Sequence, residues 1–454
     1  MIVLKDCYCV YDGNQRLYNK NVIIRDNIIH AITDPSDTSY MSIEPLPEII
    51  DCSTHIVIPG LINTHHHFYQ ILTRNLPAVQ NVELFDWLLY LYNIWQNITP
   101  QAVLYSSMAA VGELMKTGCT CSTDHHYLYP ENFNEDIMSI QFEAADQLGI
   151  RFSPTRGSMS RSRKDGGLPP DSVVQTEDAI IDDSERVIKE FHDSSPLSMR
   201  RIILAPCSPF SITSDLMKET AALARLKGVR LHTHLAETRD ENESCRKLYG
   251  CRPLELMAKC DFTGPDVFFA HGIHFNDDEL KTLAETGCGI SHCPSSNMRL
   301  GSGIARISEM IKLGINVSLA VDGSASNDSS DMLGEIRNAM LLQRVLGGAA
   351  AMTVEQAFSI ATAGGAAVLG FEKCGKIASG MAADLAVFNL ESLGYAGALS
   401  DPLAALIFCG YNHQTEYTIV NGKITVREGV LTGFDEEFLT VEVNRIASEL
   451  VKGI

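Results

Sequence analysis

The stretch Ile56-Val-Ile-Pro-Gly-Leu-Ile-Asn-Thr-His-His-His67 runs from an apolar segment straight into three consecutive histidines. A short apolar run of this kind is typical of a buried strand. Residues at i and i+2 of an extended segment project to the same side, so His65 and His67 can grip one ion from a single strand end. His66 points the other way and is expected to have a structural role. The stretch therefore predicts a strand that ends in a metal site.

The pattern that begins here continues along the chain. From about Ile62 to Leu369, short apolar runs that end in polar or charged residues alternate with helical segments. Eight such alternations predict an α/β protein built on a (β/α)8 TIM-type barrel. The predicted strands are Ile56–Asn63, Thr120–Asp124, Ile150–Thr155, Ile202–Pro206, Val229–His234, Val267–His271, Gly289–Cys293 and Asn316–Asp322. The helical segments include Ser106–Lys116, Glu219–Lys227 and Asp278–Glu285.

Both ends of the chain are rich in strands instead. Residues 1–58 contain short β-rich runs, and Glu416–Val420 and Lys423–Arg427 flank Asn421-Gly422, a strong hairpin-turn dipeptide. The simplest arrangement is one small β-sandwich built from both termini, although two unrelated caps are also compatible with the pattern. The predicted domains are a sandwich of 1–58 plus 376–437, a catalytic barrel of 59–375 and a C-terminal helix of 438–454.

Composition narrows the classes of function. The 454 residues carry 36 lysines and arginines against 56 acidic residues, a net charge of −20, which argues against nucleic acid as a partner. No apolar stretch is long enough to span a bilayer, and Met1–Asn14 has no signal-peptide pattern. The 13 cysteines lack paired CxxC spacing and are expected to be reduced thiols. We expect a cytoplasmic protein that acts on a small molecule without a membrane partner and forms a homo-oligomer.

In a barrel of this type, chemistry lies at the C-terminal ends of the strands. Three further polar groups meet that condition beside the first-strand pair, and a fourth lies close by. His234 ends the fifth predicted strand, His271 the sixth and Asp322 the eighth, with Glu237 three residues after His234. Each histidine alone is more often structural than functional. Together, imidazoles with one carboxylate suit Zn²⁺, with Fe²⁺ as the alternative, and an open coordination position would lower the pKa of a water to about 7.

Two neighbouring features refine this hypothesis. Glu237 can take a proton from water and pass it to a substrate, although a glutamate in a first helical turn can also simply favour the helix dipole. No lysine ends the fourth predicted strand, Ile202–Pro206, so a carbamylated lysine bridging two metals is not available there. One metal per chain is therefore expected.

These motifs together resemble the amidohydrolase superfamily, and within it the branch of cytosine/guanine deaminases and chlorohydrolases. The resemblance covers essentially the whole chain, including Val321-Asp-Gly-Ser-Ala-Ser-Asn327 and the tail segment from Gly375. It implies a barrel-plus-sandwich fold, a mononuclear metal site and hydrolytic removal of a group from a heterocycle. It also implies roles by position: metal ligands at His65, His67, His234 and Asp322, a proton shuttle at Glu237, and His271 with Asp322 holding the attacking water.

Several stretches look like the bacterial 8-oxoguanine deaminases, which convert 8-oxoguanine and water to uric acid and ammonia. They include Asp124-His-His-Tyr-Leu-Tyr-Pro130 and His292-Cys-Pro-Ser-Ser-Asn-Met-Arg-Leu300. Gln70 matches a guanine-deaminase feature, and its amide suits a purine edge because it can both donate and accept. Cys207 stands where guanine deaminases carry an arginine that faces the substrate carbonyl. It is either part of an altered substrate pocket or an inert buried thiol.

Other substrate contacts and functions stay open. Arg156 can donate two hydrogen bonds to a substrate carbonyl, or it can pair with an acid and brace the barrel rim. Trp87 can stack on a flat ring or pack in a core, and the polar loop Arg161–Asp171 can cover the mouth of the barrel. Alternative substrates are guanine, isoxanthopterin, or an s-triazine that loses an amino or chloro group. The non-enzyme alternative is a metal-free scaffold of the same fold, which the intact set of histidines and acids argues against.

Overall fold

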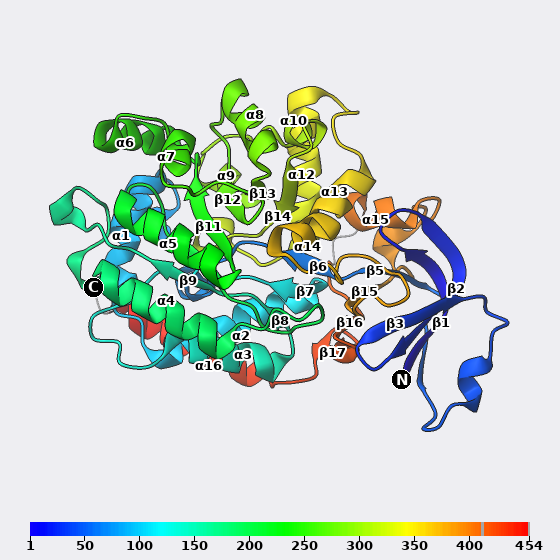
Figure 1. Ribbon diagram of the computed structural model, residues 1–454. Coiled ribbons are helices and arrows are strands. Elements are labelled where there is room, and N and C mark those ends of the chain that lie inside the picture. Colours follow the sequence, from blue (N-terminus) through cyan, green and yellow to red (C-terminus); the bar gives the residue numbers. More distant parts are fainter. Residues whose placement is uncertain (410–412, 453–454) are drawn as a thin grey trace.

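The computed structural model describes residues 1–409 and 413–452. A barrel of parallel strands, wrapped by helices, makes up most of the molecule, and a second sheet that contains the N-terminal strands lies at one side of it (Figure 1). This is the predicted combination of a TIM-type barrel with a smaller β structure formed by both ends of the chain.

The barrel consists of two hydrogen-bonded runs of parallel strands, ordered β6-β7-β8 and β9-β10-β11-β12-β13-β14. Backbone bonds join the runs into a closed ring. The amide of Thr64 donates to the carbonyl of Leu319 at 3.2 Å, and the amide of Thr155 donates to the carbonyl of Asp124 at 2.8 Å. The strands are β6 (Leu61–Asn63), β7 (Cys119–Ser122), β8 (Arg151–Phe152), β9 (Thr155–Ser158), β10 (Ile203–Pro206), β11 (Arg230–Leu235), β12 (Val267–His271), β13 (Gly289–His292) and β14 (Asn316–Leu319).

Two predicted strands are divided in the structure, each at a proline. Ile56–Asn63 splits into β5 (His55–Pro59), which belongs to the second sheet, and β6, which belongs to the barrel. A β-carbon on Gly60, between them, would lie 2.1 Å from Thr120 Oγ1, so only glycine allows this close approach. Pro154 likewise separates β8 from β9, because proline has no N–H to offer to a ladder.

The helices that surround the barrel begin and end where the local sequence directs them. α8 (Asp277–Thr286) starts at a capping box of Asn276 with Glu279 and ends at Gly287, whose φ of 76° is left-handed. Other helices are α1 (Leu84–Trp95), α2 (Pro100–Lys116), α3 (Ile137–Leu148), α4 (Glu177–Phe191), α5 (Ser214–Lys227), α6 (Arg239–Tyr249), α7 (Pro253–Lys259), α9 (Pro294–Arg299), α10 (Ile307–Lys312), α11 (Ser324–Asn327), α12 (Met332–Gly347), α13 (Val354–Ala361), α14 (Ala363–Leu369) and α15 (Pro402–Phe408).

The second sheet combines strands from both ends of the chain. β5 pairs with β1 on one side and antiparallel with β15 on the other, so the two β-rich ends are joined and are not separate caps. The predicted hairpin at Asn421-Gly422 connects β16 to β17, with φ of 50° and 75° at its two turn residues. The strands are β1 (Ile2–Tyr11), β2 (Arg16–Arg25), β3 (Ile28–Thr33), β4 (Glu48–Asp51), β5, β15 (Leu385–Asn389), β16 (Tyr417–Val420), β17 (Lys423–Arg427) and β18 (Val430–Leu431).

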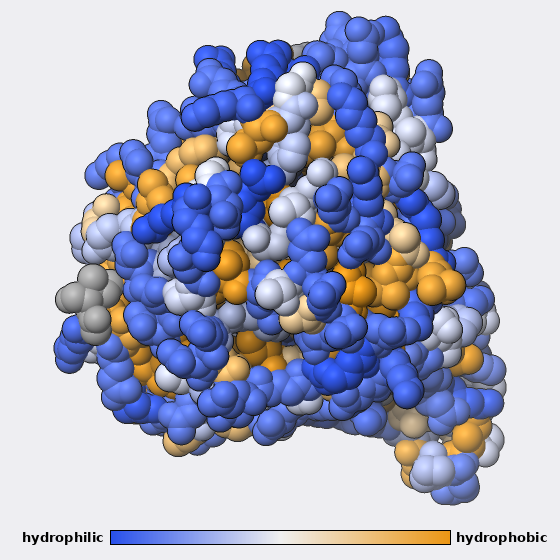
Figure 2. Space-filling view, turned by 60° about the vertical axis from the view of Figure 1, so that its left-hand side comes forward, coloured by the Kyte–Doolittle hydropathy of each residue, from blue (hydrophilic) through white to orange (hydrophobic). Residues whose placement is uncertain are grey.

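The chain ends in α16 (Glu436–Lys452), which packs on α2 and buries Leu439, Ile446 and Leu450. This helix lies where the sequence predicts a C-terminal helix of 438–454, and residues 453 and 454 lie outside the described part of the chain. Hydrophilic residues dominate the face in Figure 2, where hydrophobic side chains form separate patches. Among the described helices, none has the length and apolar character needed to cross a bilayer. The predicted domain boundaries stay a prediction.

Candidate active site

The barrel brings the predicted histidines and Asp322 to one point. His65 and His67 follow β6, His234 lies near the end of β11, and Asp322 comes three residues after β14. The ligand-type atoms of His65, His67 and His234 lie within 4.8 Å of one another, as do those of His65, His271 and Asp322. His271 and Asp322 have φ of 71° and 66°, a left-handed conformation that is strained for residues other than glycine and is concentrated at functional sites.

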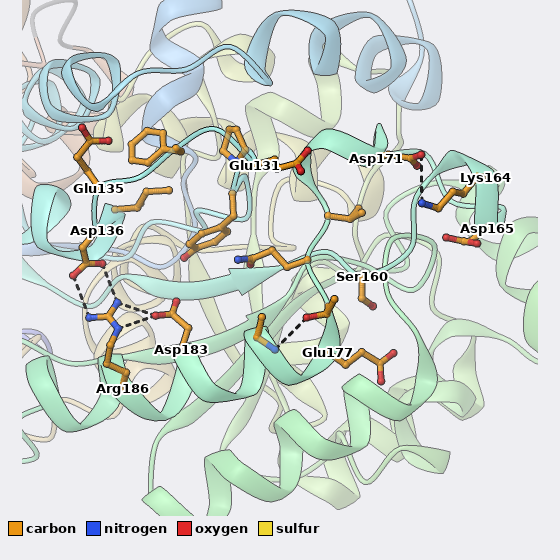
Figure 3. Close-up of a pocket in the computed structure, with 18 residues that line it drawn as sticks. Glu131, Glu135, Asp136, Ser160, Lys164, Asp165, Asp171, Glu177, Asp183 and Arg186 are labelled. Carbon is orange, nitrogen blue, oxygen red and sulfur yellow. Dashed lines mark hydrogen bonds and ion pairs between the residues drawn. The ribbon is translucent and has the colours of Figure 1, made fainter.

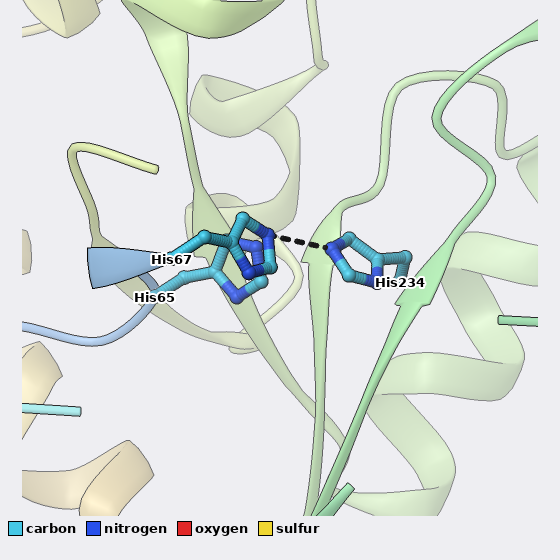
Figure 4. Close-up of side chains that lie close together, drawn as sticks. All are labelled: His65, His67 and His234. Carbon is cyan, nitrogen blue, oxygen red and sulfur yellow. Dashed lines mark hydrogen bonds between the residues drawn. The ribbon is translucent and has the colours of Figure 1, made fainter. Parts of the chain in front are cut away.

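Three of these distances define the centre of the cluster. Nε2 of His67 lies 3.2 Å from Nε2 of His234, the contact drawn in Figure 4. Oδ1 of Asp322 lies 3.4 Å from Nε2 of His65 and 3.3 Å from Nε2 of His67. All four side chains therefore direct a nitrogen or oxygen to the same small volume.

Hydrogen bonds on the far side of each ring determine which nitrogen carries the proton. Nδ1 of His67 lies 2.8 Å from the carbonyl oxygen of His125, and Nδ1 of His234 lies 2.6 Å from that of Cys207. A carbonyl can only accept, so both Nδ1 atoms donate and both Nε2 atoms of the neutral rings keep a lone pair. Two lone pairs that face each other at 3.2 Å repel unless a cation lies between them.

His65 is held in the same tautomer through a second histidine. Nδ1 of His232 lies 3.0 Å from the carbonyl oxygen of Phe268, so its Nε2 accepts. That Nε2 lies 2.8 Å from Nδ1 of His65, which must donate and leave its own Nε2 unprotonated. Within the described part of the chain, Nε2 of His65 is buried without a hydrogen-bond partner. An orphaned buried nitrogen of this kind fits a metal ligand.

The charge state of the cluster points the same way. Burial holds the pKa of His65 and of His234 well below the ordinary value, so both rings are neutral near pH 7. Burial by itself would raise the pKa of Asp322, but its contact with His65 and the nearby histidines hold it well below the usual range. Three neutral imidazole nitrogens and one carboxylate form a donor set that suits zinc. The residues present fit a divalent metal.

Glu237 and His271 face each other beside this donor set. Oε2 of Glu237 lies 3.5 Å from Nε2 of His271, whose Nδ1 lies 3.0 Å from Nδ2 of Asn297. Burial, with added repulsion from the charges of Asp322 and Glu241, raises the pKa of Glu237 well above its ordinary value. A buried carboxyl whose proton affinity is increased can both take up and release protons at neutral pH.

The backbone at Glu237 is held by a second buried carboxyl. Oε1 and Oε2 of Glu241 accept hydrogen bonds from the amides of Ala236 and Glu237, each at 2.8 Å. Ala236 has a φ of 55°, which is unfavourable for an alanine. Glu241, on the first turn of α6, therefore stabilises the turn that directs Glu237 toward the cluster.

A partly open pocket lies beside these groups. It is walled by the candidate groups together with residues of α1 and of neighbouring loops. Its lining includes Gln70 and Cys207. Burial raises the pKa of the Cys207 thiol to about 12, so it is uncharged. The rest of the wall is largely apolar and aromatic: Leu84, Trp87, Leu88, Tyr92, Tyr127, Phe210 and Leu300.

Gln70 reaches the pocket because its neighbour is a glycine. A β-carbon on Gly323, directly after Asp322, would lie 2.0 Å from Oε1 of Gln70. That oxygen is buried and has no hydrogen-bond partner among the described residues. The amide of Gln70 is therefore held against Gly323 in the wall of the pocket, with an acceptor that no described protein group uses.

The structure does not bring Arg156 to this pocket, which corrects the predicted substrate contact. Its guanidinium donates to Asp183 at 2.6 Å and to Gln175 at 2.9 Å, and it lies 3.9 Å from the centre of the Tyr129 ring. Asp183 in turn pairs with Arg186 in the wall of a separate, open depression (Figure 3). Arg156 therefore braces the barrel rim through Asp183, which is the second of the two roles that the sequence left open.

The predicted mouth loop also lies elsewhere. Lys164, Asp165 and Asp171 line the depression of Figure 3, and the loop Arg161–Asp171 contributes nothing to the lining of the pocket beside the histidine cluster. Helix α1 covers that pocket instead, with Trp87 in its wall. His66 turns away from the cluster and bonds Ser330 at 3.0 Å.

Three partners of the site were not identified from the sequence: His232, Glu241 and Asn297. His232 precedes His234 by two residues on one strand, so the i, i+2 rule that selected His65 and His67 could have found it. Glu241 lies in the first turn of α6, four residues beyond Glu237, where a carboxylate can accept from backbone amides that precede the helix. Asn297 contacts His271 through a different helix, which no local pattern indicates.

Comparisons with known proteins match this architecture. A model described as "Amidohydrolase family" matches residues 56–425. The chain is 44% identical over 410 residues to an 8-oxoguanine deaminase of Pseudomonas aeruginosa, which covers 90% of this chain and 91% of that protein. It is 36% identical to an isoxanthopterin deaminase from an unknown prokaryotic organism, over 90% of this chain and 89% of that one.

Solved structures agree. An atrazine chlorohydrolase from Arthrobacter aurescens TC1, complexed with zinc, superimposes with a TM-score of 0.93 at 28% identity and covers 98% of this chain and 100% of that one. The family match spans most of the chain, and the first relative is similar over nearly its full length. The chain belongs to the amidohydrolase family.

Proposed function

We propose that this protein is a zinc-dependent hydrolytic deaminase that converts 8-oxoguanine and water to uric acid and ammonia. The observation that supports it most is the convergence of unprotonated Nε2 atoms from His65, His67 and His234 on the carboxylate of Asp322, beside a pocket with apolar and aromatic side chains in its wall. The similarity to an 8-oxoguanine deaminase adds the substrate.

The proposed metal ligands are His65, His67, His234 and Asp322. When bound there, zinc would activate water for attack by lowering its pKa. Iron has compatible donor preferences and is the alternative ion.

The chain's own residues carry the remaining steps. Glu237 takes a proton from the attacking water and delivers it to the ring nitrogen next to the carbon that bears the amino group. His271, held by Asn297, and Asp322 orient the water at that carbon. Addition of water to the ring carbon, proton transfer to the amino group and loss of ammonia leave the carbonyl of uric acid.

The pocket lining supports an oxidised purine. The apolar and aromatic side chains of the pocket wall suit a flat ring, and the amide of Gln70 belongs to the same wall. Cys207 is a small neutral group where guanine deaminases, in the resemblance drawn above, place an arginine. A buried charge that has no counterpart on the substrate is thereby avoided.

The decisive experiment is a substrate panel with zinc-loaded protein. We expect 8-oxoguanine to release ammonia and urate with kcat/KM well above guanine, isoxanthopterin and an aminotriazine. The Glu237→Gln variant should retain zinc and lose turnover. If 8-oxoguanine releases no ammonia and another member of the panel is turned over, that compound replaces 8-oxoguanine as the proposed substrate. A protein that never binds zinc or iron would favour the metal-free scaffold.

We also propose that the protein is cytoplasmic and forms a homo-oligomer. All 13 cysteines lie in the described part of the chain and none forms a disulfide there, as expected in a reducing compartment.

A further inference from the structure

At the opposite end of the barrel from the candidate active site, two arginines meet without an acidic partner. Arg230 is the first residue of β11, whose other end carries His234, and Arg201 lies just before β10. A β-carbon built on Gly370 would lie 2.6 Å from Nε of Arg230 and 3.2 Å from Nη1 of Arg201. Both guanidinium groups therefore lie close to Gly370.

Among the described residues, no carboxylate forms an ion pair with either arginine, although Asp193 lies near Arg201 and Asp266 near Arg230. Within residues 1–409 and 413–452, neither Arg201 nor Arg230 has an ion-pair partner within 4.0 Å. Asp266, the acid that lies nearby, is paired with Arg225 at 3.2 Å. Arg201 donates to the carbonyls of Gly370 and Ser195, and Arg230 to that of Pro265. Carbonyls satisfy donors but do not cancel two positive charges, and repulsion between like charges at this range is unfavourable.

The arrangement is unusual for this chain. The protein carries a net charge of −20, so acidic side chains to pair with are abundant. Burial lowers the pKa of both guanidinium groups, and each is further lowered by a neighbouring arginine, Arg151 for Arg201 and Arg201 for Arg230. The surroundings thus disfavour the charged forms of both groups as they stand, and an anion between them would reverse that effect.

A groove of about 630 Å³ opens beside the pair, and other donors line it. Ser153 is fully buried, and its Oγ has no hydrogen-bond partner among the described residues. Nδ1 of His192 accepts from the amide of Ile202 at 3.1 Å, which leaves its Nε2 as a donor in the neutral ring. Two acids, Asp266 and Glu372, also line the groove; Asp266 is paired with Arg225, and Glu372 is exposed at the surface.

From these observations we infer that the groove at the base of the barrel is a binding site for the phosphate group of a small phosphorylated molecule, held by Arg201 and Arg230. A phosphate near neutral pH carries between one and two negative charges and has three acceptor oxygens. It can accept from two guanidinium forks and from the hydroxyl of Ser153 at once, whereas a carboxylate has only two oxygens. The groove is larger than the ion itself and leaves room for the body of the molecule. This site is independent of the proposed deamination.

The test is a titration of the zinc-loaded protein with inorganic phosphate at low ionic strength, followed by calorimetry and ³¹P NMR. Succinate at equal ionic strength serves as the carboxylate comparison. We expect saturable phosphate binding, weaker succinate binding, and a loss of at least about tenfold in phosphate affinity in Arg201→Gln and in Arg230→Gln. Lys281→Gln, which removes an exposed positive charge that does not line the groove, should bind phosphate like the native protein.

Several outcomes would overturn the site. Absence of phosphate binding by the native protein would do so. Binding that persists undiminished in both arginine variants would assign the anion to the metal cluster instead. Succinate binding as tight as phosphate binding would replace the phosphate with a carboxylate.

If both variants fail to fold, crystals of the native protein grown with selenate give an independent answer. An anomalous peak between Arg201 and Arg230 would support the site, and its absence would refute it. Basal deamination should be unchanged in any variant that folds, since neither arginine lines the catalytic pocket.

Discussion

Replacing Glu241 by glutamine tests how the protein positions its proposed proton shuttle. The Glu241 carboxylate accepts from the amides of Ala236 and Glu237, one through each oxygen, at 2.8 Å. Glutamine has the same shape but only one acceptor oxygen, and its amide nitrogen would face the second N–H. One buried amide would then lack an acceptor.

The size of the effect follows from that loss. A buried donor left without a partner costs about 1–3 kcal/mol of unfolding free energy. The turn already contains Ala236 in a left-handed conformation, so it will relax once its anchor weakens. A shift of about 1 Å at Glu237 is enough to reduce kcat by about a hundredfold, and we expect a decrease of between about tenfold and a hundredfold.

The assay combines urate formation from 8-oxoguanine with denaturant unfolding and zinc analysis. Glu243→Gln is the matched control, because Glu243 lies on the same helix with its side chain exposed. We expect Glu241→Gln to keep its zinc, lose kcat more than it changes KM, and unfold at lower denaturant than the control. Unchanged kcat and unchanged unfolding free energy in Glu241→Gln would refute the positioning role.

Three further perturbations probe other parts of the structure. His232→Leu removes the acceptor that orients His65, so zinc affinity measured in a competing-chelator titration should fall by about 10- to 100-fold; an unchanged affinity would contradict the tautomer argument. Burial raises the pKa of Glu335 to about 8, so the folded state retains a proton that the unfolded chain releases from about pH 4.3 upward. Stability should therefore fall as pH rises through this window, and urea unfolding across it should show a flatter decline in Glu335→Gln; parallel curves would contradict this. Zinc at 1,000 times its Kd should raise the unfolding free energy of the metal-free protein by about 4 kcal/mol, as followed by calorimetry, and a protein indifferent to zinc would contradict a folded-state site.

The elements that could be predicted from the sequence are those governed by local periodicity. Apolar runs that end in polar residues identified the barrel strands, and the position of His234 at a strand end indicated its place in the cluster. The division of a strand at Pro59-Gly60 depends on Thr120, which is distant in the chain, and could not be predicted locally. The same applies to Arg156, whose brace on Asp183 depends on how α4 packs against the barrel.

Residues that position other side chains were not predicted from the sequence. His232 and Asn297 hydrogen-bond to other protein side chains, so the criteria for a metal ligand or a ring contact do not select them. For Trp87, the sequence left two roles open. Its sequence context fits core packing as well as a pocket wall, and only the position of α1 over the barrel mouth decides between them.

The pairing of β5 with β15 has a consequence for the order of events during biosynthesis. Val57 lies opposite Val387, 330 residues later in the chain. At a translation rate of about 5–20 residues per second, the first strands wait for roughly a quarter of a minute to a minute before their partner leaves the ribosome. During that interval β5 presents an open edge that a chaperone or another nascent chain can occupy. Production of this protein should therefore be sensitive to chaperone supply and to growth temperature.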